Sequence, residues 1–97
     1  MTTLGYGKGQ QHEAWLGLVD EDIIEPDLPI IDPHHHLWHR PDSTYLLTEL
    51  VADVTSGHRV IGTVFAECRS MYRALGPEYL KPVGETEFVV GIAAMSA

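Results

Sequence analysis

The stretch that most constrains the fold of this chain is the nearly continuous apolar run VIGTVFA, residues 60–66. A strand buried on one face would alternate apolar with polar residues, and this run does not alternate. The pattern is typical of a strand covered on both faces, as in a parallel sheet with helices packed against it. Parallel neighbours need crossover connections, which are usually helical, so the run predicts an α/β fold.

Two segments beside this run have the patterns of the helices that such a fold requires. A stripe of leucines and valines predicts a helix from Tyr45 to Ser56, with Asp42 or Ser43 as its cap and Gly57 as its terminator. A second apolar stripe at helical spacing predicts another helix within residues 83–97. The first of these helices would connect the run 60–66 to a preceding parallel strand.

The preceding segments supply that strand and a short N-terminal helix. Residues 30–36 contain two β-branched isoleucines and predict a strand, although Pro33 would remove one of its ladder hydrogen bonds. An amphipathic pattern predicts a helix from His12 to Ile24, stopped by Pro26, after a flexible leader of residues 1–11. The order strand, helix, strand, long loop, helix implies parallel strands joined by right-handed crossovers.

Composition excludes several classes of function. The 97 residues include 14 acidic and 6 basic side chains, for a formal net charge of −8, so binding to a nucleic-acid backbone is not expected. No apolar run approaches the roughly 20 residues that span a bilayer, so no membrane partner is expected. Cys68 has no second cysteine to pair with, and the N-terminus lacks the pattern of a secretory signal. We therefore expect a cytoplasmic protein.

The histidine-rich end of the first predicted strand is the candidate functional site. If the strand is regular, Asp32, His34 and His36 share one face and His35 points to the other. Two imidazoles at this spacing can converge on one ion, but a catalytic zinc takes about three protein ligands, so they form part of a site. The alternative is that these histidines are hydrogen-bonded or solvated at a strand end, and that Asp32 satisfies nearby backbone amides.

The end of the apolar run adds a candidate carboxylate. Glu67 directly follows it, and in parallel sheets the carboxyl ends of the strands collect the catalytic groups. Its alternative role is a solvated strand terminus. Cys68 is expected to be a small packing residue, because no neighbouring feature in the sequence lowers its pKa.

Three stretches of the chain resemble a known family: IIDPHHHLW, YLLTELVADVTSGHRVIGTVFAEC and MYRALGPEYLKPVGETEFVVGIAAMSA. Together they resemble the N-terminal portion of an amidohydrolase-related, amidohydrolase 2-type metal-dependent hydrolase with a TIM-barrel fold. The resemblance implies that residues 28–97 form the first two strand–helix units of an incomplete (β/α)8 barrel. Residues 1–27 then form the leader and the short N-terminal helix.

The same resemblance implies a site and a chemistry. It assigns His34 and His36 as metal ligands supported by Asp32. Glu67 stays a candidate catalytic residue because of its position at the strand end, outside the resemblance. The cofactor implied is a divalent metal, zinc in the first place, with manganese or a metal-free site as the alternatives. Members of the family use activated water against amide, ester or lactone bonds of small molecules, and some relatives decarboxylate aromatic acids.

This chain departs from the family pattern in extent. The family's later elements, a histidine from a middle strand and a late aspartate that acts as general base, would lie beyond residue 97, and two strands cannot close a barrel. We therefore expect an N-terminal fragment that is inactive alone and self-associates through open sheet edges. The alternative is a small non-catalytic module that holds a metal or a partner through its histidine cluster, closed by oligomerisation.

Overall fold

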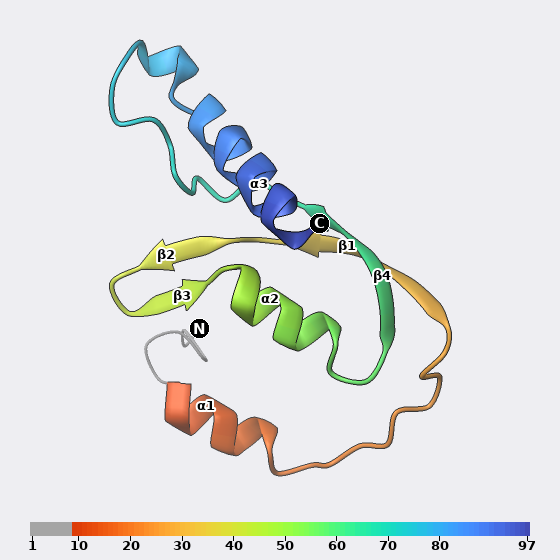
Figure 1. The fold of residues 1–97 in the computed structure, drawn as a ribbon. Helices are drawn as coiled ribbons and strands as arrows, with labels where there is room; N and C mark the ends of the chain where they lie inside the picture. The colour runs from red at the N-terminus through yellow and green to blue at the C-terminus, as the bar shows by residue number, and fades with distance from the viewer. Residues whose placement is uncertain (1–8) are drawn as a thin grey trace.

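A computed structural model describes residues 9–97, with side chains from residue 13 onward (Figure 1). The chain is a mixed α/β structure with one parallel and one antiparallel sheet of two strands each. The elements, in chain order, are α1 (Gly9–Leu16), β1 (Pro29–His35), β2 (Trp38–Arg40), β3 (Ser43–Tyr45), α2 (Leu47–Val54), β4 (Arg59–Phe65), the 3-10 turn η1 (Glu78–Leu80) and α3 (Val83–Ser96).

The parallel sheet is the one that the sequence predicts. β1 and β4 pair in parallel, with Asp32 opposite Thr63 and His35 opposite Phe65. Three residues of β1 therefore span the distance that two residues of β4 span, and Pro33 lies in this irregular segment. A bulge is where a strand tolerates a proline, because the extra residue is left out of the ladder. The predicted α/β class and the predicted order of β1, α2, β4 and α3 are thus confirmed, and within the described residues two sheets of two strands each are present and no closed barrel.

A β-hairpin that the sequence analysis missed occupies the segment between β1 and α2. β2 and β3 pair antiparallel, and the rings of Trp38 and Tyr45 stack with centroids 5.1 Å apart. Trp38 Nε1 donates to Ser43 Oγ at 2.9 Å, and the guanidinium of Arg40 lies over the Trp38 ring. Cross-strand aromatic pairs of this kind stabilise short hairpins. Strand pairing therefore overrides the helical pattern around residue 45.

The hairpin moves the start of the following helix. Helix α2 begins at Leu47, so the predicted start at Tyr45 and the predicted capping role of Asp42 or Ser43 are wrong. The backbone amide of Leu46 instead donates a hydrogen bond to Glu49 Oε1 at 2.8 Å. The far end agrees better with prediction, because Gly57 has a φ of 136°. A side chain at that position would be strained by the backbone and would collide with Ile23.

The N-terminal helix differs in its bounds from the prediction of 12–24. Helix α1 begins at Gly9 and ends at Leu16, followed by a turn in which the Gly17 amide donates to the Glu13 carbonyl. The helix ends early because glycine disfavours continuation and the acidic cluster that follows has no apolar face to bury. Residues 9–11 of the expected flexible leader belong to α1, and the rest of that leader lies outside the described residues.

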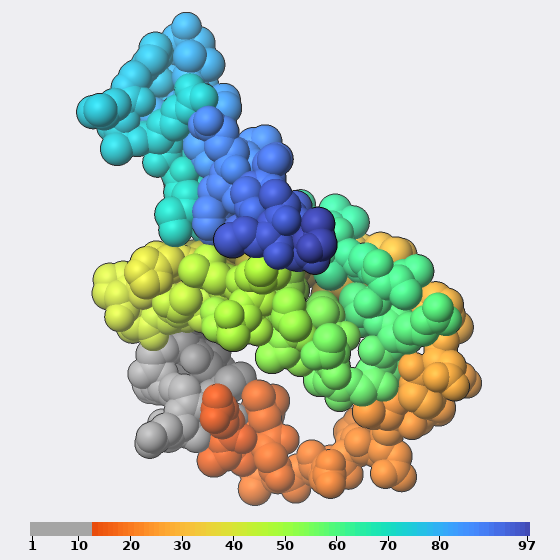
Figure 2. Space-filling view, viewed as in Figure 1, coloured from red at the N-terminus to blue at the C-terminus, as the bar shows by residue number. Residues whose placement is uncertain are grey.

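The apolar core is small. Among the described residues, Leu37 is 1% exposed and Ile92 is 9% exposed, and these are the buried apolar side chains. The radius of gyration is 16.1 Å, against about 13 Å for a compact domain of similar length. Figure 2 shows α3 and the loop before it projecting from the rest of the molecule. No helix within the described range has the length and apolarity needed to cross a bilayer.

Candidate functional site

His34 and His36 face each other at the carboxyl end of β1. Their Nε2 atoms lie 3.1 Å apart, and their rings are nearly perpendicular, at 87°, with centroids 4.8 Å apart. His34 is exposed and His36 is half-buried. The two predicted metal ligands are therefore adjacent in space, with the same nitrogen of each ring in mutual contact.

His36 is held in place by the neighbouring strand. Its Nδ1 lies 2.8 Å from the carbonyl oxygen of Ala66, the residue directly after β4. A carbonyl only accepts hydrogen bonds, so Nδ1 carries a proton, and the tautomer with this single proton has a lone pair at Nε2. Metal-ligating histidines are fixed by such a bond from the other ring nitrogen, commonly to a backbone carbonyl. With this tautomer, the donor in the 3.1 Å contact between the two Nε2 atoms is His34.

The separation of the two nitrogens fits coordination to one ion. With zinc–nitrogen bonds of about 2.05 Å and tetrahedral angles, two ligand nitrogens are about 3.3 Å apart. The observed 3.1 Å differs by a shift well within side-chain freedom. For both rings to ligate, the proton on His34 Nε2 has to leave and Nδ1 has to be the protonated nitrogen. His34 and His36 can thus supply two ligands to a divalent ion such as zinc.

The structure does not add a third ligand to this pair. Within the described residues, no group of three or more histidine, cysteine, aspartate or glutamate side chains is placed to hold a metal ion. Asp32, predicted to support the pair, accepts a hydrogen bond from the backbone amide of His34 at 3.1 Å. This contact fixes the backbone of the bulge, so Asp32 acts on His34 through the main chain.

His35 points away from the pair, as predicted. Its ring packs edge-on against Phe65, with centroids 5.6 Å apart, and it lines a mostly apolar cavity of about 280 Å³ between the sheet, α2 and α3. Burial lowers the pKa of His35, and the negative charge of Asp32 opposes this shift. The Nδ1 atom is buried and has no hydrogen-bond partner within the described part of the chain. His35 is therefore a packing residue on the helix-covered face.

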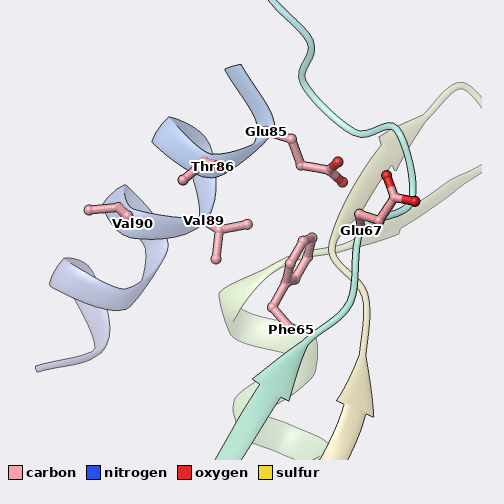
Figure 3. Close-up of a pocket in the computed structure, with 6 residues that line it drawn as sticks. All are labelled: Phe65, Glu67, Glu85, Thr86, Val89 and Val90. Carbon is pink, nitrogen blue, oxygen red and sulfur yellow. The ribbon is translucent and has the colours of Figure 1, made fainter. Parts of the chain in front are cut away.

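Glu67 follows β4 at the same end of the sheet as the histidine pair, because its neighbour Ala66 bonds His36. Its side chain lines a second cavity, of about 340 Å³, together with Phe65, Glu85 and residues of α3 (Figure 3). Figure 3 shows the carboxylates of Glu67 and Glu85 on the same side of this cavity. The two histidines do not line it. Glu67 thus lies at the same end of the sheet as the pair, but its side chain lines the cavity beside α3, which the pair does not line.

A buried polar junction that the sequence analysis missed ties α3 to the loops after β1 and β4. Glu85 is 5% exposed, and its Oε2 accepts hydrogen bonds from the backbone amides of Cys68 and Ser70 at 2.9 and 3.1 Å. Ser70 Oγ donates to the Leu37 carbonyl at 2.5 Å. We call these four residues the Glu85 junction. The available sequence signal was a glutamate in the first turn of a strongly apolar helix, next to the small residue Gly84.

The junction explains two further residues. Gly84 packs so closely against the backbone of residues 71–73 that an added Cβ would lie 2.5 Å from the carbonyl oxygen of Met71. The Cys68 thiol donates to the Leu37 carbonyl at 3.4 Å and lies 3.1 Å from Ser70 Oγ. This agrees with the predicted packing role of Cys68.

Comparison with known proteins adds no assignment, because no family model, no curated protein and no solved structure matches the chain.

Proposed function

We propose that this chain is the N-terminal part of an amidohydrolase-type metal-dependent hydrolase, with His34 and His36 as two ligands of a divalent ion. The observation that carries the proposal is the convergence of the two Nε2 atoms, 3.1 Å apart, at the carboxyl end of a parallel strand. This is the edge at which α/β enzymes assemble their sites. The sequence resemblance, with a metal pair on the first strand, supports the same assignment. Zinc is the preferred ion because neutral imidazole suits it, and manganese is the alternative.

The chemistry proposed is hydrolysis of an amide, ester or lactone bond in a small molecule. A bound divalent ion lowers the pKa of water and polarises the scissile carbonyl. In this chain, the Ala66 carbonyl orients His36, and Asp32 fixes the backbone that carries His34. Glu67, which follows β4 at the same end of the sheet as the pair, is the candidate for proton transfer. We expect the remaining ligands and the general base to come from later strands of the barrel, and a cytoplasmic location.

According to this proposal, the 97-residue chain binds a divalent metal ion but does not catalyse hydrolysis. Catalysis requires a positioned base and a preorganised pocket, and a misplacement of about 1 Å can cost about 10²-fold in rate. The test measures zinc and manganese binding by calorimetry, and hydrolysis of a lactone and ester panel by the same preparation. Binding that disappears in His34→Ala and His36→Ala, without hydrolysis, is the expected result. Metal-dependent turnover that disappears in these variants would show that the site is complete within this chain.

A second candidate function is a non-catalytic module that holds a metal or a partner. The observation in its favour is that the described residues bring two histidines together and no third ligand. The two functions differ in what the gene encodes next. Further strand–helix units with a histidine and a late aspartate after residue 97 would support the hydrolase, whereas a stop codon there would support the module.

A further inference from the structure

We propose that Glu85 is a positioning residue for His36, which it holds in place through the loop after β4 and the carbonyl of Leu37. The inference rests on the metal-binding role proposed above for the histidine pair. It adds to that role a buried carboxylate on α3 that sets the direction of one ligand without contacting it. The Glu85 junction therefore serves the site as well as the stability of the fold.

The end of β1 is attached to the segment after β4 on both sides of His36. On one side, the Ala66 amide donates to the His35 carbonyl at 2.8 Å, and the Ala66 carbonyl bonds the ring of His36 at the same distance. On the other side, the carbonyl of the fully buried Leu37 accepts a hydrogen bond from Ser70 Oγ at 2.5 Å. The direction of the His36 ring therefore depends on where the segment after β4 lies.

Glu85 determines the shape of that segment. Its Oε2 accepts from the amides of Cys68 and Ser70 at 2.9 and 3.1 Å, so both neighbours of Arg69 are bonded to one buried oxygen. Arg69 has a φ of 62° and Met71 has a φ of 56°, left-handed conformations that cost free energy in residues with a side chain. Such conformations persist where the surrounding contacts enforce them. The carboxylate of Glu85 is the contact that spans Arg69.

Loss of the carboxylate should let the loop relax. Without their acceptor, the two amides turn toward water, and Arg69 returns to the right-handed region. Ser70 Oγ then leaves the Leu37 carbonyl, and the Cys68 thiol, which lies 3.4 Å from the same oxygen, moves with the loop. The backbone next to His36 loses its partner. Groups that orient metal-ligating histidines contribute about 10–100-fold to metal affinity, so we expect weaker binding of zinc.

The experiment combines calorimetric titration of the full chain with zinc chloride and nitrogen NMR of the His36 ring in chelator, at a pH where the ring is neutral. The ring shifts report which nitrogen carries the proton, and in the wild type this should be Nδ1. Glu85→Ala should lower zinc affinity about tenfold and give a mixture of tautomers. Glu85→Gln keeps an oxygen that accepts from both amides, and should retain the wild-type affinity and tautomer.

Two further variants separate positioning from stability. Ile92→Ala removes a buried side chain of α3 that makes no contact with the junction hydrogen bonds. It should lower the unfolding free energy and leave zinc affinity and the His36 tautomer unchanged. Ser70→Ala removes the hydroxyl that reaches Leu37 and keeps the carboxylate. It should lower zinc affinity in the same direction as Glu85→Ala, and it replaces that variant if circular dichroism shows that Glu85→Ala does not fold.

Each result decides one of the two roles. Unchanged affinity and tautomer in folded Glu85→Ala or in Ser70→Ala would overturn the positioning role and leave the junction purely structural. The same changes in Ile92→Ala as in Glu85→Ala would also overturn it, because any loss of stability would then produce them. Absence of zinc binding in the wild type would overturn the proposed metal role alone, since the His36 tautomer still decides whether Glu85 positions the ring.

Discussion

Two groups of polar side chains lie at the carboxyl end of the β1–β4 sheet, and they differ in how far their hydrogen-bonding capacity is used inside the chain. In the Glu85 junction, the buried carboxylate accepts from two backbone amides and Ser70 bonds the Leu37 carbonyl. In the histidine pair, two ring nitrogens face each other near the surface. Buried polar groups that are satisfied internally stabilise a fold, whereas accessible lone pairs are available to a ligand. The first group is thus structural, and the second is the candidate site.

The largest expected effect on stability is that of Glu85→Ala. Removing this carboxylate leaves the backbone amides of Cys68 and Ser70 without their acceptor in a buried position, at a cost of about 3 kcal/mol of unfolding free energy. Urea denaturation followed by circular dichroism measures the loss. Glu87→Ala is the matched control, because Glu87 pairs with Arg73 at the surface, and its effect should be much smaller. Equal losses in the two variants would contradict the structural role of the junction.

A smaller loss is expected for Ser70→Ala. This change removes the hydroxyl that donates to the Leu37 carbonyl, which should lower the unfolding free energy by about 1.5 kcal/mol. The control is Ser96→Ala, since Ser96 Oγ donates to the Ala93 carbonyl at an exposed helix end. The same denaturation assay should give little change for that control. If Ser70→Ala is as stable as the wild type, the Cys68 thiol alone satisfies the Leu37 carbonyl.

His35→Phe should stabilise the chain by about 1 kcal/mol, since it removes a buried nitrogen without a partner and keeps a ring against Phe65. It should also change the pH dependence. Burial lowers the pKa of His35 below 6.5, so the unfolded chain binds more protons between the two values. Stability of the wild type therefore falls as pH decreases through 6.5, and the variant should lose the part of this fall due to His35. Denaturation midpoints at neutral and mildly acidic pH measure this fall in stability. The control His58→Gln should show the same fall as the wild type.

The smallest effect on stability is expected for His34→Ala. The ring is exposed, so the unfolding free energy should stay within about 0.5 kcal/mol of the wild type, while zinc binding is lost. Measuring both quantities on one preparation sharpens the contrast with Glu85→Ala, which should be destabilised through a different set of contacts. A large loss of stability in His34→Ala would place the histidine pair among the structural groups.

Much of the fold could be predicted because it depends on local pattern. The apolar run 60–66 gave the parallel strand, and the opposite directions of His34 and His35 follow from strand alternation. The hairpin at residues 38–45 could not be predicted in the same way, because a stacked pair of aromatic rings from two strands decides it. The early end of α1 was missed because an apolar period was extended through a glycine and an acidic cluster.

The sequence by itself determined the α/β class, the order of the main elements and the presence of two histidines at one strand end. These follow from periodicity, which is a property of neighbouring residues. Tertiary structure decided the surroundings of each carboxylate. Glu85 is buried because the loop that follows β4 brings two backbone amides to it, and Glu67 lines a cavity together with residues of α3. His36 acquires its orientation from the Ala66 carbonyl, 30 residues away in the chain. Such contacts depend on which segments meet in space, and residue type and spacing do not encode that.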